Sequence, residues 1–241
     1  MRRTLFAGLL MTAIAAAAAS CASGVPAATE PPPAPTPSPA PGVDEVPATP
    51  QPSATPPAAR TTFVIVPEES EVRFLIDEIL AGSAKTVVGT TTAVQGSISG
   101  DFADPASASL APIVVDLSTL RTDNSFRNRA IHDAILQTGI EANRYAVFEI
   151  DEIEGLPEVA VPGTSYELSL TGDLTIHGVT RRVTFAAMVT PVSPTRLEGT
   201  AWLTIPYAEF DVRILRLPPQ VASVGDLVTL EIDFVAVASE L

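Results

Sequence analysis

The chain has 241 residues, of which 28 are acidic and only 14 are lysine or arginine, so its formal net charge is −14. This acidic balance argues against binding to nucleic acids or to anionic membrane surfaces, whose phosphates attract cationic proteins. The single cysteine excludes an intramolecular disulfide bond.

The first 20 residues are typical of a secretory signal peptide. Arg2 and Arg3 precede a short apolar run that ends at Ala18-Ala19-Ser20-Cys21, which is the order of charged, apolar and small residues in such peptides. The run is too short for a membrane-spanning helix, which needs about 20 apolar residues. Cys21 resembles the acylated cysteine of bacterial lipoproteins, although Ala18 stands where that pattern usually has a larger aliphatic residue. The alternative is a plain signal peptide that leaves an unpaired thiol.

Residues 21–60 are predicted to be a disordered linker. Thirteen of the 23 prolines lie here, diluted by alanine, serine and threonine. Such segments are extended and build no core; at about 3.1 Å per residue this one reaches on the order of 100 Å. We expect a tether that holds a lipid-anchored domain in the cell envelope, on the periplasmic or extracellular side. The alternative is an extension with no selected length.

Residues 61–241 have the length of one domain, and their pattern predicts strand after strand. Apolar and polar residues alternate at 72–77, 148–151, 210–214 and 230–236. A less regular alternation covers 62–66, 86–99, 111–117 and 195–207. Glycine-containing turns separate several runs. Eight or more short strands predict an all-β fold, either an antiparallel barrel or a sandwich. The alternation alone does not distinguish the two.

One segment, within 118–146, departs from the strand pattern. Ile131 and Ile135 lie four residues apart, which is the spacing of one helix face. An Asp-Asn-Ser run at 123–125 offers candidate N-caps, and Gly139 is expected to end the helix. The sequence therefore predicts one short helix, inserted to close one end of the β-domain.

The stretch from Gly172 to Phe185, Gly-Asp-Leu-Thr-Ile-His-Gly-Val-Thr-Arg-Arg-Val-Thr-Phe, predicts a β-hairpin. Its alternation breaks at His177 and the following glycine and then resumes, as in two strands joined by a short turn. The sequence of this stretch resembles a signature hairpin of the YceI-like family, whose members are lipocalin-like barrels that bind polyisoprenoids. The resemblance covers nearly all of residues 61–241.

A second stretch resembles a polar segment of the same family that contains an Arg-Asp pair and a histidine. The chain agrees with this segment at Ser118, Thr122, Asn124, Arg127, Tyr145 and Phe148 and departs from it at Asn128, Ala130, Ile131 and Ala146. The family's aspartate and histidine are therefore absent here. The role in positioning a ligand that they would imply is not carried over to this chain.

No pattern typical of an enzyme is found. The stretch Gly96-Ser97-Ile98-Ser99-Gly100 has isoleucine where a nucleophile elbow needs serine. His132 and His177 are the only histidines, too few for a zinc site of histidine and cysteine. We interpret His177 as a turn residue that hydrogen-bonds nearby backbone, rather than as a general base. No catalytic residue, metal site or cofactor other than a bound lipid is predicted.

Alternation also predicts which side chains point into a barrel. They are Phe74, Phe148, Leu170, Leu174, Phe185, Phe210, Ile214 and Phe234. A small barrel either fills with such side chains or encloses one ligand, so periodicity leaves a solid core as an alternative. The family resemblance implies a polyprenyl lipid or quinone in the lumen, bound without catalysis. The competing function is a stress-associated or adhesive interaction module with a solid core; the oligomeric state, a homodimer included, stays open.

Overall fold

The computed structural model describes residues 60–215, 217 and 219–239. The predicted signal peptide, Cys21 and the predicted linker up to residue 59 lie outside the described residues. The strands are β1 (Thr61–Ile65), β2 (Glu71–Leu80), β3 (Ser83–Thr91), β4 (Val94–Gln95), β5 (Ser97–Asp101), β6 (Asp104–Leu110), β7 (Ile113–Asp116), β8 (Tyr145–Glu154), β9 (Tyr166–Ile176), β10 (Val179–Ser193), β11 (Arg196–Pro206) and β12 (Val221–Ala238).

These twelve strands form one antiparallel sheet that curls into a barrel. Neighbours run in the order β4-β7-β8-β9-β10-β11-β12-β1-β5-β6. β4 and β5 are separated only by Gly96, and the first pairs with β7 whereas the second pairs with β1. Residues 94–101 therefore connect β4, at one end of the strand order, to β5, which is next to the strand at the other end. The predicted all-β barrel is confirmed.

The predicted hairpin at residues 172–185 is formed by β9 and β10. Their register pairs Leu170 with Phe185 and Ile176 with Val179. The turn is made by His177 and Gly178, with φ angles of 52° and 71°, a left-handed pair that suits the twist of a two-residue hairpin. Local turn chemistry and alternation thus agree, which is why this element could be predicted so closely.

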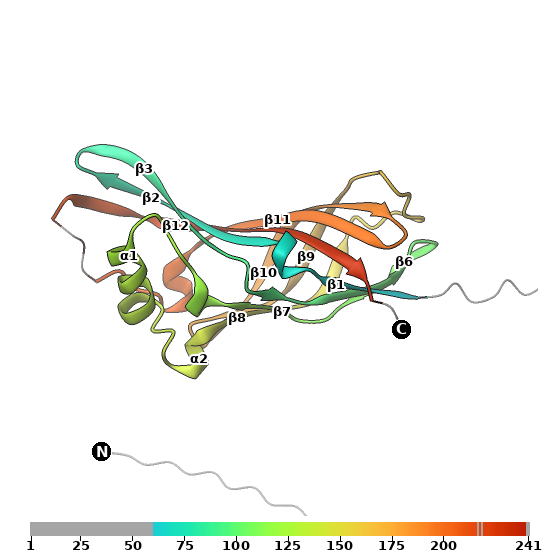
Figure 1. Ribbon diagram of the computed structural model, residues 1–241, viewed down its shortest axis with the longest axis horizontal. Helices are drawn as coiled ribbons and strands as arrows, with labels where there is room; N and C mark the ends of the chain where they lie inside the picture. The colour runs from blue at the N-terminus through green and yellow to red at the C-terminus, as the bar shows by residue number, and fades with distance from the viewer. Residues whose placement is uncertain (1–59, 216, 218, 240–241) are drawn as a thin grey trace, which may run out of the picture. The chain divides into compact units, whose positions relative to one another are not determined.

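The barrel is extended at one end by β2, β3 and the first half of β12. β2 pairs with β12 on one side and with β3 on the other, and in Figure 1 this ribbon projects past β10 and β11 above α1 (Ser125–Ala130). The C-terminal part of β12 pairs instead with β1. One strand therefore contributes both to the barrel and to the projecting ribbon.

The segment between β7 and β8 is helical, as predicted, but ends differently. Asn124 caps α1 by accepting hydrogen bonds from the backbone of Phe126 and Arg127. A π-helical turn at Ile131–Ile135 continues the helix, and Gln137, with φ of 52°, turns the chain before Gly139. A further one-turn helix, α2 (Glu141–Arg144), follows. No helix in the described part of the chain has the length and apolar character needed to cross a membrane.

The strand predicted at 210–214 is wrong. Tyr207–Phe210 is a 3-10 turn, and the chain from Asp211 to Leu215 is outside any strand. Asp211 adopts φ of 53°, and this left-handed conformation cannot continue a β-strand. Phe210 and Val212 are buried even so, because a turn that packs on the barrel can bury alternate residues without any sheet hydrogen bond.

An ion pair fixes α2 to the end of β7. The Arg144 guanidinium donates to Asp116 at 2.8 Å, and together with donors from Ser118 it lowers the pKa of the Asp116 carboxyl. A lowered pKa means that this stabilisation is present above the unfolded-state value, about 3.9, and is lost as pH falls through the folded-state value.

We therefore expect Arg144→Gln to lower the free energy of unfolding slightly near neutral pH, because the pair is partly exposed and water weakens it. Once Asp116 is protonated, wild type and variant are expected to have the same stability. Urea unfolding of both proteins at a series of pH values measures the difference. A difference that persists unchanged at acid pH contradicts the assignment to this carboxylate.

Candidate functional site

An apolar cavity of about 260 Å³ lies inside the barrel; we call it the lumen cavity. Polar side chains in its wall are few, namely Arg73, Asp101, Tyr166 and Glu231. Arg73 and Glu231 are paired with each other at 3.2 Å, so this charge pair is satisfied within the wall. The lumen cavity thus offers an apolar ligand burial but little hydrogen bonding.

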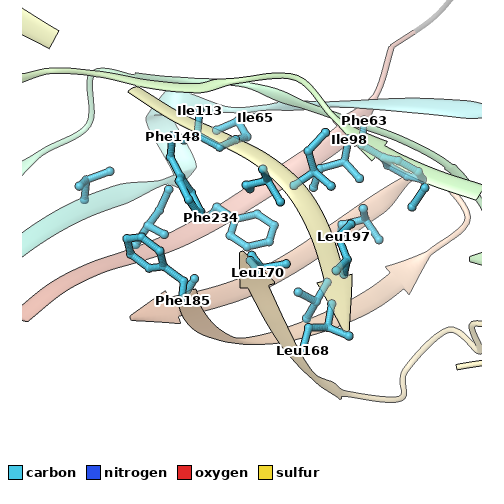
Figure 2. A pocket seen from close by; sticks show the side chains of 18 of the residues that line it. Phe63, Ile65, Ile98, Ile113, Phe148, Leu168, Leu170, Phe185, Leu197 and Phe234 are labelled. Atoms are coloured by element: carbon cyan, nitrogen blue, oxygen red, sulfur yellow. The ribbon is translucent and has the colours of Figure 1, made fainter. Parts of the chain in front are cut away.

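Side chains from opposite walls converge on this cavity (Figure 2). The labelled ones come from eight strands spread over the whole domain: Phe63, Ile65, Ile98, Ile113, Phe148, Leu168, Leu170, Phe185, Leu197 and Phe234. The rings of Phe148 and Phe185 are tilted by 43° with centroids 4.8 Å apart, a favourable aromatic geometry. These aromatic rings give the wall fixed shape as well as apolar area.

Glycines opposite two of the aromatic residues determine where the rings lie. Phe74 pairs with Gly89 and Phe234 with Gly199 across adjacent strands, and a Cβ at either glycine would overlap the facing ring. Each ring therefore lies flat over its glycine. Phe74 in particular stands between the lumen cavity and a second cavity, because it lines both.

The second cavity, which we call the cap cavity, measures about 820 Å³. α1, the projecting ribbon of β2, β3 and β12, and described residues within 207–215 and 219–221 contribute to its wall. It adjoins the lumen cavity through five shared wall residues, Phe74, Leu117, Leu120, Ile176 and Leu230. The two cavities are thus neighbouring compartments of one interior.

The eight side chains predicted to point into the barrel are divided between these compartments. The lumen cavity is lined by Phe74, Phe148, Leu170, Leu174, Phe185 and Phe234, whereas Phe210 and Ile214 line the cap cavity together with Phe74. Placing Phe210 and Ile214 in the lumen was wrong, because the turn at Asp211 removes them from the sheet. That any of the eight contacts a ligand stays a prediction.

The sequence named six residues of the lumen wall and missed most of the others, and it did not predict that the cap cavity exists as a separate compartment. Phe63 and Ile65 alternate in the run 62–66, and this signal could have placed them inside. No comparable signal marks Leu117 or Leu120, which lie in and after a short 3-10 turn.

Four charged side chains line the cap cavity and form an alternating chain of ion pairs, here called the charge cluster. Arg127 donates to Glu78 at 3.0 Å and to Asp123 at 2.5 Å, and Lys85 contacts Asp123 at 2.9 Å. The Glu78 side chain is only 5% exposed. The hydrogen bond from Lys85, followed by the charges of Lys85 and Arg127, lowers the pKa of Asp123.

The charge cluster gives Arg127 carboxylate partners that the sequence did not indicate. Asn128 stands in place of the family's aspartate, and Arg127 pairs with Glu78 and Asp123 instead. Asn128 instead accepts hydrogen bonds from the backbone and hydroxyl of Thr122 at 2.8 and 2.7 Å. Arg127 is therefore held in place by partners that only the fold brings together.

The two histidines occupy different surroundings. His132 contacts the Leu120 carbonyl and the Arg121 guanidinium through Nε2, both at 2.9 Å. Both ring nitrogens of His177 are buried and have no hydrogen-bond partner among the described residues. His177 is a turn residue, as predicted. The prediction that its ring hydrogen-bonds nearby backbone is wrong, because neither ring nitrogen forms such a bond within the described part of the chain. Its left-handed backbone turns the ring into the protein rather than along the chain.

The comparisons with known proteins agree with this architecture. A family model described as the YceI-like domain matches residues 63–236. The chain belongs to the YceI-like family. A comparison with curated proteins gave no match.

Two solved structures are similar to this YceI-like domain. A polyisoprenoid-binding domain from Saccharophagus degradans implicated in plant cell wall breakdown is 17% identical, with a TM-score of 0.58; the match covers 74% of this chain and 99% of that one. BcnA from Burkholderia cenocepacia is 19% identical, with a TM-score of 0.53, over 71% of this chain and 98% of that one. At such identities the likeness establishes the YceI-like fold.

Proposed function

We propose that this protein is an exported lipoprotein, anchored through Cys21, whose barrel binds and carries or sequesters a long apolar isoprenoid lipid such as a quinone or a polyprenyl compound. The single observation that supports this most is the apolar lumen cavity adjoining the larger cap cavity. An elongated amphiphile matches two neighbouring compartments better than a compact polar metabolite does.

The physical basis is burial of hydrocarbon. Removing a methylene group from water contributes roughly 0.8 kcal/mol, and the lumen wall offers aromatic and aliphatic surface from β1, β8, β10 and β12. Apolar walls with few polar groups are what ligand pockets generally use. Membership of the YceI-like family, and the polyisoprenoid-binding domain among the similar structures, support the same class of ligand.

The proposed role is non-catalytic. The charge cluster is paired internally, and Arg73 and Glu231 are paired with each other at the lumen wall. Such arrangements position and neutralise charge; a general acid or base needs a group whose proton is available to a substrate. Holding the lipid in the barrel and releasing it unchanged requires no such group.

Native mass spectrometry with organic extraction, on protein purified from its own membrane, tests the proposal. We expect an isoprenoid lipid at near-stoichiometric occupancy. In Leu170→Trp, whose larger side chain takes up lumen space, we expect occupancy to fall by about tenfold or more, because overpacking costs about 1–3 kcal/mol.

Thr184→Trp is the matched control, since Thr184 is exposed on the outer face of β10. It adds the same side chain without entering the lumen, so its lipid content is expected to equal that of wild type. Absence of lipid from the wild-type protein would favour the alternative, an interaction module with a solid core.

A further inference from the structure

The charged side chains in the wall of the cap cavity carry balanced charge. Glu78 and Lys85 face each other across β2 and β3, while Asp123 and Arg127 lie one helical turn apart at the start of α1. Two acids and two bases therefore line the cavity, and each is paired with at least one of the others. The sum of their charges is zero.

Arg127, the cation nearest the buried carboxylate of Glu78, has no unneutralised charge to offer. Its two terminal nitrogens already donate to Glu78 and to Asp123, and Lys85 is held by Asp123. An anion that entered the cap cavity would meet two carboxylates for every two cations. It would lose its hydration without gaining a partner, which is the costly case for a buried charge.

Uncharged polar groups complete the wall. Tyr207 and Gln220 line the same cavity and supply a hydroxyl and an amide. The N–H bonds of the Arg127 guanidinium outnumber its two ionic contacts, since an arginine has five. Groups of this kind can hydrogen-bond a carbonyl or hydroxyl oxygen that carries no charge.

We propose that the cap cavity is a headgroup site that selects uncharged isoprenoid lipids, such as quinones and prenyl alcohols, and rejects phosphorylated ones, with the tail in the lumen cavity. This inference rests on the proposed function and makes it narrower. It assigns the selection to the charge cluster, in which Glu78 cancels the attraction of Arg127 for a phosphate. The net charge of −14 acts in the same direction.

The test compares the dissociation constants of geranylgeraniol and geranylgeranyl monophosphate, measured by equilibrium dialysis with the full chain at one ionic strength. We expect the wild type to bind the alcohol at least about tenfold more tightly than the phosphate. In Glu78→Gln, which leaves the cluster with one excess positive charge, we expect this preference to shrink at least about fivefold.

Two further variants make the result decisive. Lys85→Gln changes the cluster in the opposite direction and is expected to widen the preference for the alcohol; Lys85 is partly exposed, so this variant is expected to fold even if Glu78→Gln does not. Glu198→Gln removes the same kind of charge from an exposed pair with Arg196 and is expected to leave the preference unchanged.

The outcomes separate the two proposals. Equal or tighter binding of the phosphate by the wild type, or a preference that neither Glu78→Gln nor Lys85→Gln alters, overturns the headgroup inference and leaves lipid binding standing. If neither probe binds the wild type, lipid binding itself fails and the headgroup inference fails with it.

Discussion

Replacing Phe185 by aspartate is expected to abolish lipid binding and to lower the free energy of unfolding by about 3–5 kcal/mol. Phe185 is 8% exposed, and losing a buried phenyl ring alone has a cost of that size. The new carboxylate would lie against Phe148, 4.8 Å from ring centroid to ring centroid in the wild type, where burial disfavours its charged form. An apolar tail would meet a polar group in the wall of the lumen cavity.

The measurement pairs urea unfolding with the lipid extraction described above, at a temperature where the variant remains folded. Phe185→Leu is the matched control: it stays apolar and is expected to keep its lipid at a cost of about 1.5 kcal/mol. A folded Phe185→Asp protein that retains lipid would place the ligand outside the lumen cavity. If the wild type holds no lipid and Phe185→Asp only loses stability, the result would indicate a solid core.

Replacing Gly172 by alanine is expected to destabilise the protein by about 3 kcal/mol, at the upper end of overpacking effects. A Cβ at Gly172 would overlap the carbonyl oxygen of Glu149 and come within 2.8 Å of the Ile150 Cα. Both are backbone atoms of the paired strand β8, whose register shifts just after Ile150. Because a backbone cannot rotate away as a side chain can, strands β8 and β9 would have to separate.

Thermal unfolding measures this effect, and about 3 kcal/mol corresponds to a fall in Tm of about 6–12 °C for a domain of this size. Gly100→Ala is the control, since the nearest atom to its new Cβ is the Ala108 Cβ at 3.5 Å. That variant is expected to stay within about 0.5 kcal/mol of wild type. If the two variants have the same Tm, the close approach of β8 to Gly172 is contradicted.

Much of the fold could be predicted because local patterns determine it. A period of two along the chain places Phe74, Phe148 and Phe234 on the inner face whichever strands happen to be neighbours. The turn at His177 and Gly178 is likewise a local matter. At Asp211 a single left-handed backbone angle ends any strand, and alternation in the sequence does not reveal such an angle. The predicted strand at 210–214 is wrong for this reason.

The cap cavity could not be predicted in the same way. Glu78 and Arg127 are separated by 49 residues, and they meet only because β2 extends past the barrel to α1. The spacing of Asp123 and Arg127 on one helix turn was a signal for half of the charge cluster. The other half depends on the pairing of β2 with β3 and on the length of the projecting ribbon, neither of which a single sequence specifies.

The pairing of β12 also has a consequence for how the protein reaches this structure. β12 pairs with β11, β2 and β1, and its end matches Ala238 with Phe63. The first strand of the domain can pair early with β5 on one side, but its partner on the other side exists only after nearly all of the domain has been synthesised. Pairing over such long separations slows folding, and until then the edges of β1 and β2 are open to other strands. During that interval the nascent domain is most exposed to misassembly, and a chaperone that shields strand edges would act on it then.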